Sequence, residues 1–329
     1  MSQGIKIGIL GTAAIAQNAI IPTILSLKDS FMLYGIASRD INKAKDIAAK
    51  YECNFYGSYA DLLSVDAIKA VYIPLPNALH FEWIKKSLKE GKHVLVEKSL
   101  ACTYNEAVEL NEIARSKNLV LLENFQFQFH NQLHELKKLI GEGAIGELRG
   151  MRSSFGFPPF KDYNNIRYSK NLGGGALLDA GAYPIKIAQI FLGLDIRISS
   201  ASWTLDKSLE VDLWGGGFIK SDSSNQFCQF SFGFDNYYQC NVEFWGSEGK
   251  ITANRIFTAK HDYNPTFIIE NKDGIRTVIT EKDDHFKNMF CHFNLLMRNE
   301  NDGKRKDEYY FNINQARLIE EFINKANEK

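Results

Sequence analysis

The sequence predicts an α/β domain with a parallel sheet, followed by an α+β domain with a large, mostly antiparallel open sheet. Two observations indicate this fold class: short apolar runs alternate with ten-residue helical stretches in the first third, and a period-two alternation of apolar and polar residues dominates later. The length of 329 residues suits two domains. We expect them at residues 1–123 and 124–329.

The first domain reads as strand and helix in turn. Its apolar runs predict strands at residues 5–10, 32–37, 70–73, 93–96 and 119–122, and helical spacing predicts helices at 15–27, 40–50, 80–90 and 104–116. Short buried strands separated by helices indicate a parallel sheet with helices on both faces.

The second domain reads as a sheet with one buried face. Phe230, Phe232 and Phe234 alternate with polar or small residues, and a similar alternation continues over 238–244, with Asp235-Asn236 as a plausible hairpin turn between them. Further strands are expected at 148–156, 198–204, 211–220, 249–253, 266–270 and 276–280. A helix over 177–190 separates the early strands, and a last amphipathic helix at 313–327 is a candidate to pack back on the first domain.

Composition excludes several classes of partner. The 39 basic and 39 acidic side chains cancel, whereas nucleic acids and anionic membranes select for a basic surplus. No apolar run approaches the roughly 20 residues that span a bilayer, and the amino terminus does not resemble a signal peptide. The five cysteines are scattered and include no C-x-x-C pair. We therefore expect a cytoplasmic protein with free thiols, no metal, and a small-molecule ligand.

A dinucleotide-binding motif follows the first strand. The segment Gly11-Thr12-Ala13-Ala14-Ile15-Ala16 fits G-x-G-x-x-G/A with alanine at the middle position. A Rossmann-type fold places a tight turn and a helix amino terminus there, facing a pyrophosphate. Small residues at such a turn can also serve packing alone, but their position at the first βα turn favours cofactor binding.

The end of the second strand indicates which dinucleotide binds. NAD-binding folds place Asp or Glu there for the ribose 2′-hydroxyl, whereas an arginine accommodates a 2′-phosphate. Here the chain reads Ser38-Arg39-Asp40, with Lys43 one helical turn later. We expect NADP(H) in preference to NAD(H), with Arg39 on the phosphate. The alternative is a surface arginine bonded to Asp40 or to a helix end.

Motifs spread over nearly the whole chain resemble the Gfo/Idh/MocA oxidoreductase family. These are the Gly11 turn, the segment 74–80 (PLPNALH), Glu97-Lys98, and the segment 173–184 (GGGALLDAGAYP). The segments 123–125, 129–132, 155–159 and 165–168 make the resemblance greatest for sugar-nucleotide 3-ketoreductases of deoxysugar biosynthesis. The usual E-K-P motif departs here to Glu97-Lys98-Ser99, and Tyr183 stands where many members have a histidine.

The resemblance implies site residues in both domains. Reduction of a ketone needs a hydride donor and a proton donor at the carbonyl oxygen. Lys98, Tyr183 and Asp179 are the implied catalytic residues, with Tyr183 as the acid and the Lys98 ammonium on the substrate oxygen. Asp179 and Tyr183, four residues apart, are expected on one helix face. The implied cofactor-binding residues are Gly11, Thr12, Ala13, Ala14, Ile15, Ser38, Arg39, Lys43, Pro74, Leu75, Asn77, His80, Glu97 and Lys98.

The nucleotide half of the substrate is assigned to the stretch Phe155–Tyr168. Aromatic rings there can stack on a base, and Arg167 can pair with a diphosphate. The alternative is a Pro-rich loop packed under the second sheet. The substrate-binding residues expected are Asn124, Phe157, Arg167, Tyr168 and Asp179.

Other patterns have simpler interpretations. His130 and His134 are four apart, but without a third ligand they are better explained as helix-surface histidines than as a metal site. The basic run Lys304-Arg305-Lys306 is expected to be a solvated face. Trp203, Trp214 and Trp245 suggest an exposed sheet face that is covered by a homo-oligomer, a dimer or tetramer formed sheet to sheet.

Three functions stay open at this point. The first is NADPH-dependent reduction of a 3-keto sugar nucleotide, plausibly a dTDP-linked 6-deoxyhexose. The second is NADP-dependent dehydrogenation of a free sugar or a cyclic diol. The third is a non-catalytic, cofactor-binding regulator with the same fold, against which Lys98, Asp179 and Tyr183 argue.

Overall fold

A computed structural model describes residues 4–298 and 303–328, which divide into two compact units. The first unit takes in the chain up to Asn124 together with Phe286–Ile313. The second takes in Phe125–His285 and the chain from Asn314 on. Each unit has its own sheet, and each is described below by itself.

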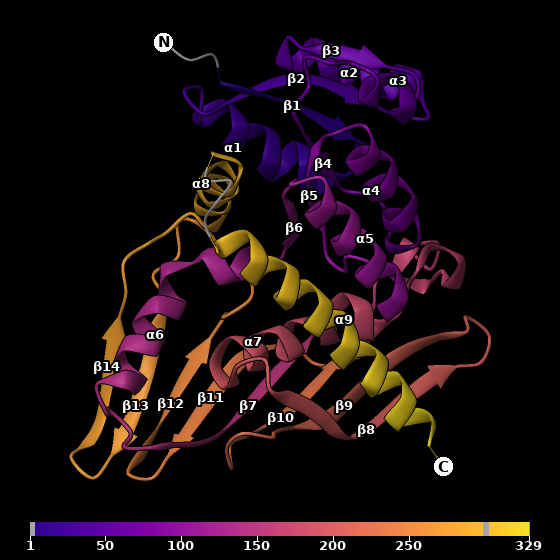
Figure 1. The fold of residues 1–329 in the computed structure, drawn as a ribbon. Coiled ribbons are helices and arrows are strands. Elements are labelled where there is room, and N and C mark those ends of the chain that lie inside the picture. Colours follow the sequence, from indigo (N-terminus) through magenta and orange to yellow (C-terminus); the bar gives the residue numbers. More distant parts are fainter. Residues whose placement is uncertain (1–3, 299–302, 329) are drawn as a thin grey trace. The chain divides into compact units, whose positions relative to one another are not determined.

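The first unit is built on a six-stranded parallel sheet in the order β3-β2-β1-β4-β5-β6 (Figure 1). The strands are β1 (Ile5–Leu10), β2 (Phe31–Ala37), β3 (Asn54–Tyr56), β4 (Ala70–Ile73), β5 (His93–Glu97) and β6 (Leu121–Asn124). Every residue of β4 is buried, as expected for a central strand of a sheet covered on both faces. The parallel sheet predicted from the sequence is confirmed.

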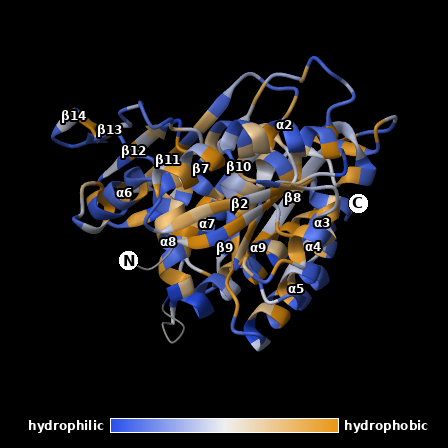
Figure 2. Cartoon of the chain, turned by 90° about the horizontal axis from the view of Figure 1, so that it is seen from above, coloured by the Kyte–Doolittle hydropathy of each residue, from blue (hydrophilic) through white to orange (hydrophobic). Residues whose placement is uncertain are grey.

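Helices connect these strands. They are α1 (Ile21–Ser26), α2 (Ile41–Tyr51), α3 (Tyr59–Leu63), α4 (His80–Lys89) and α5 (Tyr104–Ser116), with α8 (His285–Arg298) and the start of α9 (Lys304–Asn327) added from the end of the chain. Hydrophobic and hydrophilic residues interleave along α4 and α5 in Figure 2, as they do in amphipathic helices with one buried face. Strand β3 and helix α3 were not predicted, because three and five residues are too few to show a period.

One predicted strand is displaced. The apolar run 119–122 predicts a strand that the structure places at Leu121–Asn124. Two backbone groups at the start of the run bond to side chains: the Leu119 carbonyl accepts from the Tyr309 hydroxyl at 2.5 Å, and the Val120 N–H donates to His93 Nδ1 at 3.0 Å. Apolar character marks what is buried, and these side chains decide where the strand begins.

The second unit is built on an eight-stranded sheet in the order β14-β13-β12-β11-β7-β10-β9-β8. Its strands are β7 (Leu148–Gly156), β8 (Ile196–Asp206), β9 (Val211–Ser221), β10 (Phe227–Gly233), β11 (Gln239–Gly246), β12 (Gly249–Asn254), β13 (Thr266–Asn271) and β14 (Gly274–Ile279). All neighbours are antiparallel except β7 and β10, which run parallel. The mostly antiparallel sheet expected from the alternation is confirmed.

The hairpin expected at Asp235-Asn236 is wrong. Strands β10 and β11 do not pair with each other, because β7 lies between them: Ser153 of β7 faces Phe230 on one side and Val242 on the other. The connection is fixed to the end of β7, since the Phe157 N–H donates to the Gly233 carbonyl at 3.1 Å. The alternation specifies which face of a strand is buried, but not which strand lies beside it.

Helices cover one face of this sheet: α6 (Asn131–Gly141), α7 (Ala182–Leu192) and the end of α9 (Figure 1). Phe191 of α7 packs on Phe244, with ring centroids 4.4 Å apart, and Phe322 of α9 packs between Phe230 and Phe232. These aromatic contacts close the core of the second unit.

The three tryptophans assigned to an exposed face do not all lie on it. Trp203 packs on Phe322, with ring centroids 5.9 Å apart, and therefore belongs to the helix-covered face. Trp214 and Trp245 are 39% and 59% exposed. The expectation is corrected for Trp203, because a β-bulge near Ser199 shifts the register of β8 by one residue.

Among the helices of the described residues, none combines the length and the apolar character needed to cross a bilayer.

Candidate functional site

The predicted cofactor residues gather at one edge of the first unit's sheet. Strand β1 lies between β2 and β4, so the order of the strands reverses at β1. Open α/β sheets bind ligands beyond the carboxyl ends of the strands at such a point. The predicted residues follow β1, β2, β4 and β5, four adjacent strands. The topology therefore brings segments from residues 11 to 98 to a single edge.

The turn after β1 fits a diphosphate. Gly11 has φ +123°, and a Cβ there would lie 3.0 Å from the Leu75 side chain, so both conformation and space require glycine. Ala14 and Ile15 are exposed, and a π-helical turn at Ala16–Ile20 follows them. Such π-helical turns frequently occur at functional sites. Thr12 and Ala13 lie half-buried in the same turn.

Two charged residues at the end of β2, Arg39 and Asp40, have different roles. Asp40 caps α2, and its carboxylate accepts the backbone N–H groups of Asn42 and Lys43 at 3.1 and 3.4 Å. Arg39 is exposed and hydrogen-bonds the hydroxyl of Tyr59. Burial raises the pKa of Tyr59, and the charge of Arg39 opposes this rise. The alternative in which Arg39 bonds to Asp40 is not observed, since Arg39 bonds to Tyr59. The guanidinium fits a 2′-phosphate.

His80 ties two predicted cofactor loops together. Its side chain is fully buried, with Nδ1 2.6 Å from the Ser99 carbonyl oxygen and Nε2 2.7 Å from that of Leu75. Asn77 adds a third link, because its Oδ1 accepts the Ser99 N–H at 3.2 Å. Burial lowers the pKa of His80 to about 4, although both carbonyls oppose that shift. These contacts join the loop after Pro74 to the loop after Lys98.

The carboxylate beside Lys98 is held from two sides. Glu97 Oε1 accepts from the Tyr72 hydroxyl and from the Asn124 amide, each at 2.6 Å. Asn124, which the sequence assigns to the substrate, is 1% exposed and contacts Glu97. Lys98 itself is half-buried at the carboxyl end of β5.

Tyr183 lies in a shell of phenylalanine rings in the second unit. It is 8% exposed, and its ring centroid lies 5.0 to 5.7 Å from four others. These belong to Phe125, Phe127, Phe155 and Phe257. The rings restrict the phenol to one orientation and exclude water from its faces.

Asp179 and Arg167 form an ion pair in the same unit. Arg167 Nε donates to Asp179 Oδ2 at 2.6 Å, and the guanidinium lies 4.9 Å from the Phe160 ring centroid. Asp179 belongs to a second π-helical turn, Leu177–Gly181, which leads directly into α7 and to Tyr183. The structure thus joins two predicted substrate residues that are twelve positions apart.

The remaining predicted substrate residues are packed. Phe157 contacts Phe155, Phe160 and Phe234 with centroids 5.3 to 5.6 Å apart, and the buried Tyr168 accepts the Phe160 N–H at 3.0 Å. This matches the packed-loop alternative for both side chains. Tyr163, which lies in the predicted stretch but was not named individually, is 71% exposed and stacks on Tyr168.

The paired histidines are not both on the surface. His134 is exposed on α6, whereas His130 is 2% exposed, and its Nδ1 accepts the Gln132 N–H at 3.2 Å. His130 caps α6 and contacts His285, with ring centroids 5.9 Å apart. The described residues contain no group of three His, Cys, Asp or Glu side chains that could hold a metal ion.

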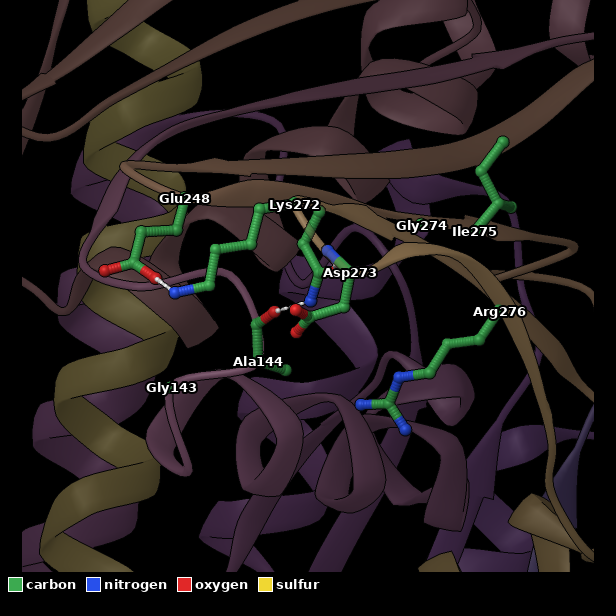
Figure 3. Close-up of a pocket in the computed structure, with 9 residues that line it drawn as sticks. Gly143, Ala144, Glu248, Lys272, Asp273, Gly274, Ile275 and Arg276 are labelled. Carbon is green, nitrogen blue, oxygen red and sulfur yellow. Dashed lines mark hydrogen bonds and ion pairs between the residues drawn. The ribbon is translucent and has the colours of Figure 1, made fainter.

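Figure 3 shows a pocket of about 430 Å³ at the β13–β14 turn of the second unit. Lys272 and Arg276 line it from the hairpin, and Glu248 lies opposite, in an ion pair with Lys272 at 3.7 Å. None of the predicted site residues lines this pocket.

Comparison with known proteins agrees with this geometry. Residues 5–125 match the model of an oxidoreductase family with an NAD-binding Rossmann fold, and residues 133–252 match the Gfo/Idh/MocA C-terminal domain. The fold is that of a nicotinamide-dependent oxidoreductase.

Several curated relatives are named for the same reaction. The dTDP-3,4-didehydro-2,6-dideoxy-α-D-glucose 3-reductase of Actinomadura kijaniata is 37% identical, covering 86% of this chain and 84% of its own. The enzyme of that name from Streptomyces antibioticus is 34% identical, covering 97% and 96%. A crystal structure of the A. kijaniata 3-ketoreductase with NADP and TDP-benzene superposes with a TM-score of 0.92, at 33% identity and 96% coverage of both chains.

The chain belongs to the Gfo/Idh/MocA oxidoreductase family, as the sequence motifs predict.

Several residues of the site were missed in the sequence. Tyr59, Phe127 and Phe257 contact predicted site residues, and Asp212 contacts Leu177 of the motif at 173–184. Each is distant in the chain from its partner or lies outside the quoted motifs. Phe125 is part of a quoted motif, but nothing in one sequence places its ring beside Tyr183. Only contacts made by folding identify these residues.

Proposed function

We propose that this protein is an NADPH-dependent 3-ketoreductase that acts on a dTDP-linked 3-keto deoxyhexose in deoxysugar biosynthesis. The observation that carries the proposal is similarity, over 86% to 97% of the chain, to relatives named for that reduction. The second-unit geometry supports it, because the same short helical segment bears both an enclosed tyrosine and a carboxylate paired with Arg167.

The first unit supports NADPH as the cofactor. Asp40 is engaged by the α2 amino terminus, which leaves the exposed Arg39 as the group that recognises a 2′-phosphate. The Gly11 turn accommodates the diphosphate, as do the adjoining residues Thr12 to Ile15. Bound NADPH supplies the hydride that reduces the C3 carbonyl. A crystallised relative contains NADP.

In this proposal the protein's own residues manage the proton. Tyr183 donates a proton to the carbonyl oxygen as negative charge develops there, and the Lys98 ammonium hydrogen-bonds the same oxygen. The phenylalanine shell keeps the hydroxyl of Tyr183 in a fixed direction. Asp179 holds Arg167, whose exposed edge is available to the substrate diphosphate.

Two further expectations belong to this proposal. We infer a homo-oligomer that buries the sheet face bearing Trp214 and Trp245, because exposed aromatic side chains of this size favour association. A cytoplasmic location suits an enzyme that uses NADPH and keeps five free cysteines.

The decisive experiment follows NADPH oxidation with a panel of substrates. We expect turnover with dTDP-linked 3-keto deoxyhexoses, and stabilisation against thermal unfolding by dTDP. Turnover of free D-xylose or a cyclic diol without any effect of dTDP would instead identify the dehydrogenase alternative, an activity for which more distant relatives are named.

Tyr183→Phe tests the proton donor in the same assay. Loss of a positioned acid costs about 10²–10⁴ in rate. The folded state should be retained, since the substitution keeps the ring that packs among the four phenylalanines. Near-full turnover by Tyr183→Phe would move the donor elsewhere.

A further inference from the structure

Asp212, on β9, carries a carboxylate that is buried against the start of the segment bearing Asp179 and Tyr183. It is 8% exposed, and its Oδ2 accepts the Leu177 N–H at 2.5 Å. The Ala176 N–H also bonds to this carboxylate. A carboxylate that accepts two N–H groups at the start of a helical segment fixes the backbone there.

The two glycines before that segment, Gly174 and Gly175, pack closely beside the Asp212 carboxylate and the Arg167 backbone. Gly175 has φ +113°, and a Cβ added to it would lie 2.2 Å from Asp212 Oδ1, closer than any real contact. On the other side, the Gly175 N–H donates to the Arg167 carbonyl at 2.9 Å. A Cβ on Gly174 would lie 2.5 Å from the same carbonyl oxygen. The two glycines therefore allow close contact with Asp212 on one side and Arg167 on the other.

These contacts transmit the position of Asp212 to the site. The Gly175 carbonyl accepts the Asp179 N–H at 3.3 Å, and Asp179 in turn holds Arg167. The π-helical turn then passes into α7, where Tyr183 is the second residue. A shift at residues 175–177 would displace Asp179 and Tyr183 together.

The free-energy cost of burying the Asp212 carboxylate argues against a role for Asp212 in stability alone. Burial raises the pKa of Asp212 to about 6, and only backbone N–H groups oppose the shift. An ionised carboxylate without a cationic partner is expensive to bury. Groups of this kind commonly lie at functional sites.

We propose that Asp212 is a positioning residue for the ketoreduction, which orients Asp179 and Tyr183 by fixing the backbone of residues 175–177. This inference rests on the proposed function.

The test compares Asp212→Asn with a matched control, Asp206→Asn. Asp206, at the end of β8, also accepts two backbone N–H groups, those of Ser208 and Leu209 at 2.8 and 3.0 Å, but in an exposed turn. Small misplacements of reacting groups cost up to about 10²-fold in rate. We expect Asp212→Asn to lower kcat about 10- to 100-fold and to change the KM for NADPH less than about 2-fold. Asp206→Asn should leave both unchanged.

Gly175→Ala tests the same contact from the opposite side and remains informative if Asp212→Asn does not fold. Its added methyl group must displace the carboxylate, so it should reproduce the fall in kcat. Because both changes act on the same contact, the double variant should be about as active as the less active of the two single variants. Multiplicative losses would show that the two residues act separately and would overturn the inference.

Hydrogen exchange separates failure of this inference from failure of the proposed function. In Asp212→Asn, amides of residues 176–183 should exchange faster while those of β9 and β10 keep their protection. Absence of wild-type turnover on every 3-keto sugar nucleotide would refute the proposed function and leave this readout intact. Unchanged exchange, or kcat within about 2-fold of wild type, would refute the role of Asp212.

Discussion

Arg39 and Asp40 are adjacent charged residues with different partners in the fold. Either could have governed the choice of dinucleotide from the sequence, since an aspartate there typically binds the ribose of NAD. In the structure Asp40 caps α2, and Arg39 extends from the end of β2 with its guanidinium on Tyr59. The helix amino terminus satisfies the carboxylate, and the arginine is the residue that we propose for the 2′-phosphate.

Arg39→Asp should therefore raise the KM for NADPH about 10- to 100-fold and change that for NADH far less, because the bidentate partner of the phosphate is lost and a negative charge replaces it. Steady-state kinetics with both cofactors measure this effect. Lys45→Asp makes the same change of charge on the exposed side of α2 and should alter neither constant by more than about 2-fold. Equal effects of Arg39→Asp on both cofactors would remove Arg39 from this role.

Tyr183 and Lys98 could be selected from motifs, but their surroundings could not. Nothing in the sequence indicates that Phe257 contacts Tyr183, because 74 residues separate them and each aromatic residue has many potential partners. The interpretation of 304–306 as a solvated basic face is wrong for Arg305, which is 4% exposed, and right for the exposed Lys304 and Lys306. Adjacent side chains on a helix point in different directions.

At the scale of elements, the last two helices depend on that buried arginine. Arg305 donates to the carbonyls of Leu296 and Met297 at 2.6 and 3.0 Å, and to the carbonyl and side-chain oxygens of Asn118 at 3.0 and 2.7 Å. It thus satisfies the carboxyl end of α8 and fastens α9 to the loop before β6. Helix α9 begins at Lys304, nine residues before the predicted start at 313.

Arg305→Met should lower the free energy of unfolding by about 2–4 kcal/mol, because it leaves buried carbonyl groups without donors. Urea unfolding followed by circular dichroism measures this loss. Lys306→Met removes an exposed charge from the next position and should change stability by less than about 0.5 kcal/mol. A loss no larger than that of the control would show that water replaces Arg305.

In the sheet of the second unit, the alternation of apolar and polar residues predicts the buried face of a strand but not its neighbour. Alternation identified β10 and β11 and their buried faces, yet it suggested a hairpin where β7 intervenes. Strand neighbours are selected by backbone groups that are the same in every residue. Side-chain pattern therefore specifies the face and leaves the partner open.

At the scale of the whole molecule, buried histidines couple stability to pH. Burial lowers the pKa of His93 and of His285 to about 4, with Arg305 contributing at His93 and His130 at His285. The unfolded chain binds protons near pH 6.5, whereas the folded chain resists them. The folded state must therefore lose stability as the pH falls from about 6.5 toward 4.

His93→Asn should reduce that loss between pH 7 and pH 5 by about 1 kcal/mol, after allowance for solvent screening. The asparagine oxygen can still accept the Val120 N–H that His93 Nδ1 accepts at 3.0 Å, but it does not titrate. Urea unfolding at both pH values measures the difference. His134→Asn, at an exposed position, should leave the slope unchanged, and an unaltered slope in His93→Asn would contradict the linkage.

The sequence by itself determined the two sheet types, most strands, the family and the residues of its motifs, because periodicity and short motifs are local properties of the chain. Tertiary structure alone decided that β7 separates β10 from β11, that Asp40 serves α2 and that Arg305 is buried. It also decided that Asp212 meets Leu177, 35 residues earlier in the chain. Such contacts depend on which distant segments meet when the core closes, and no local pattern encodes that choice.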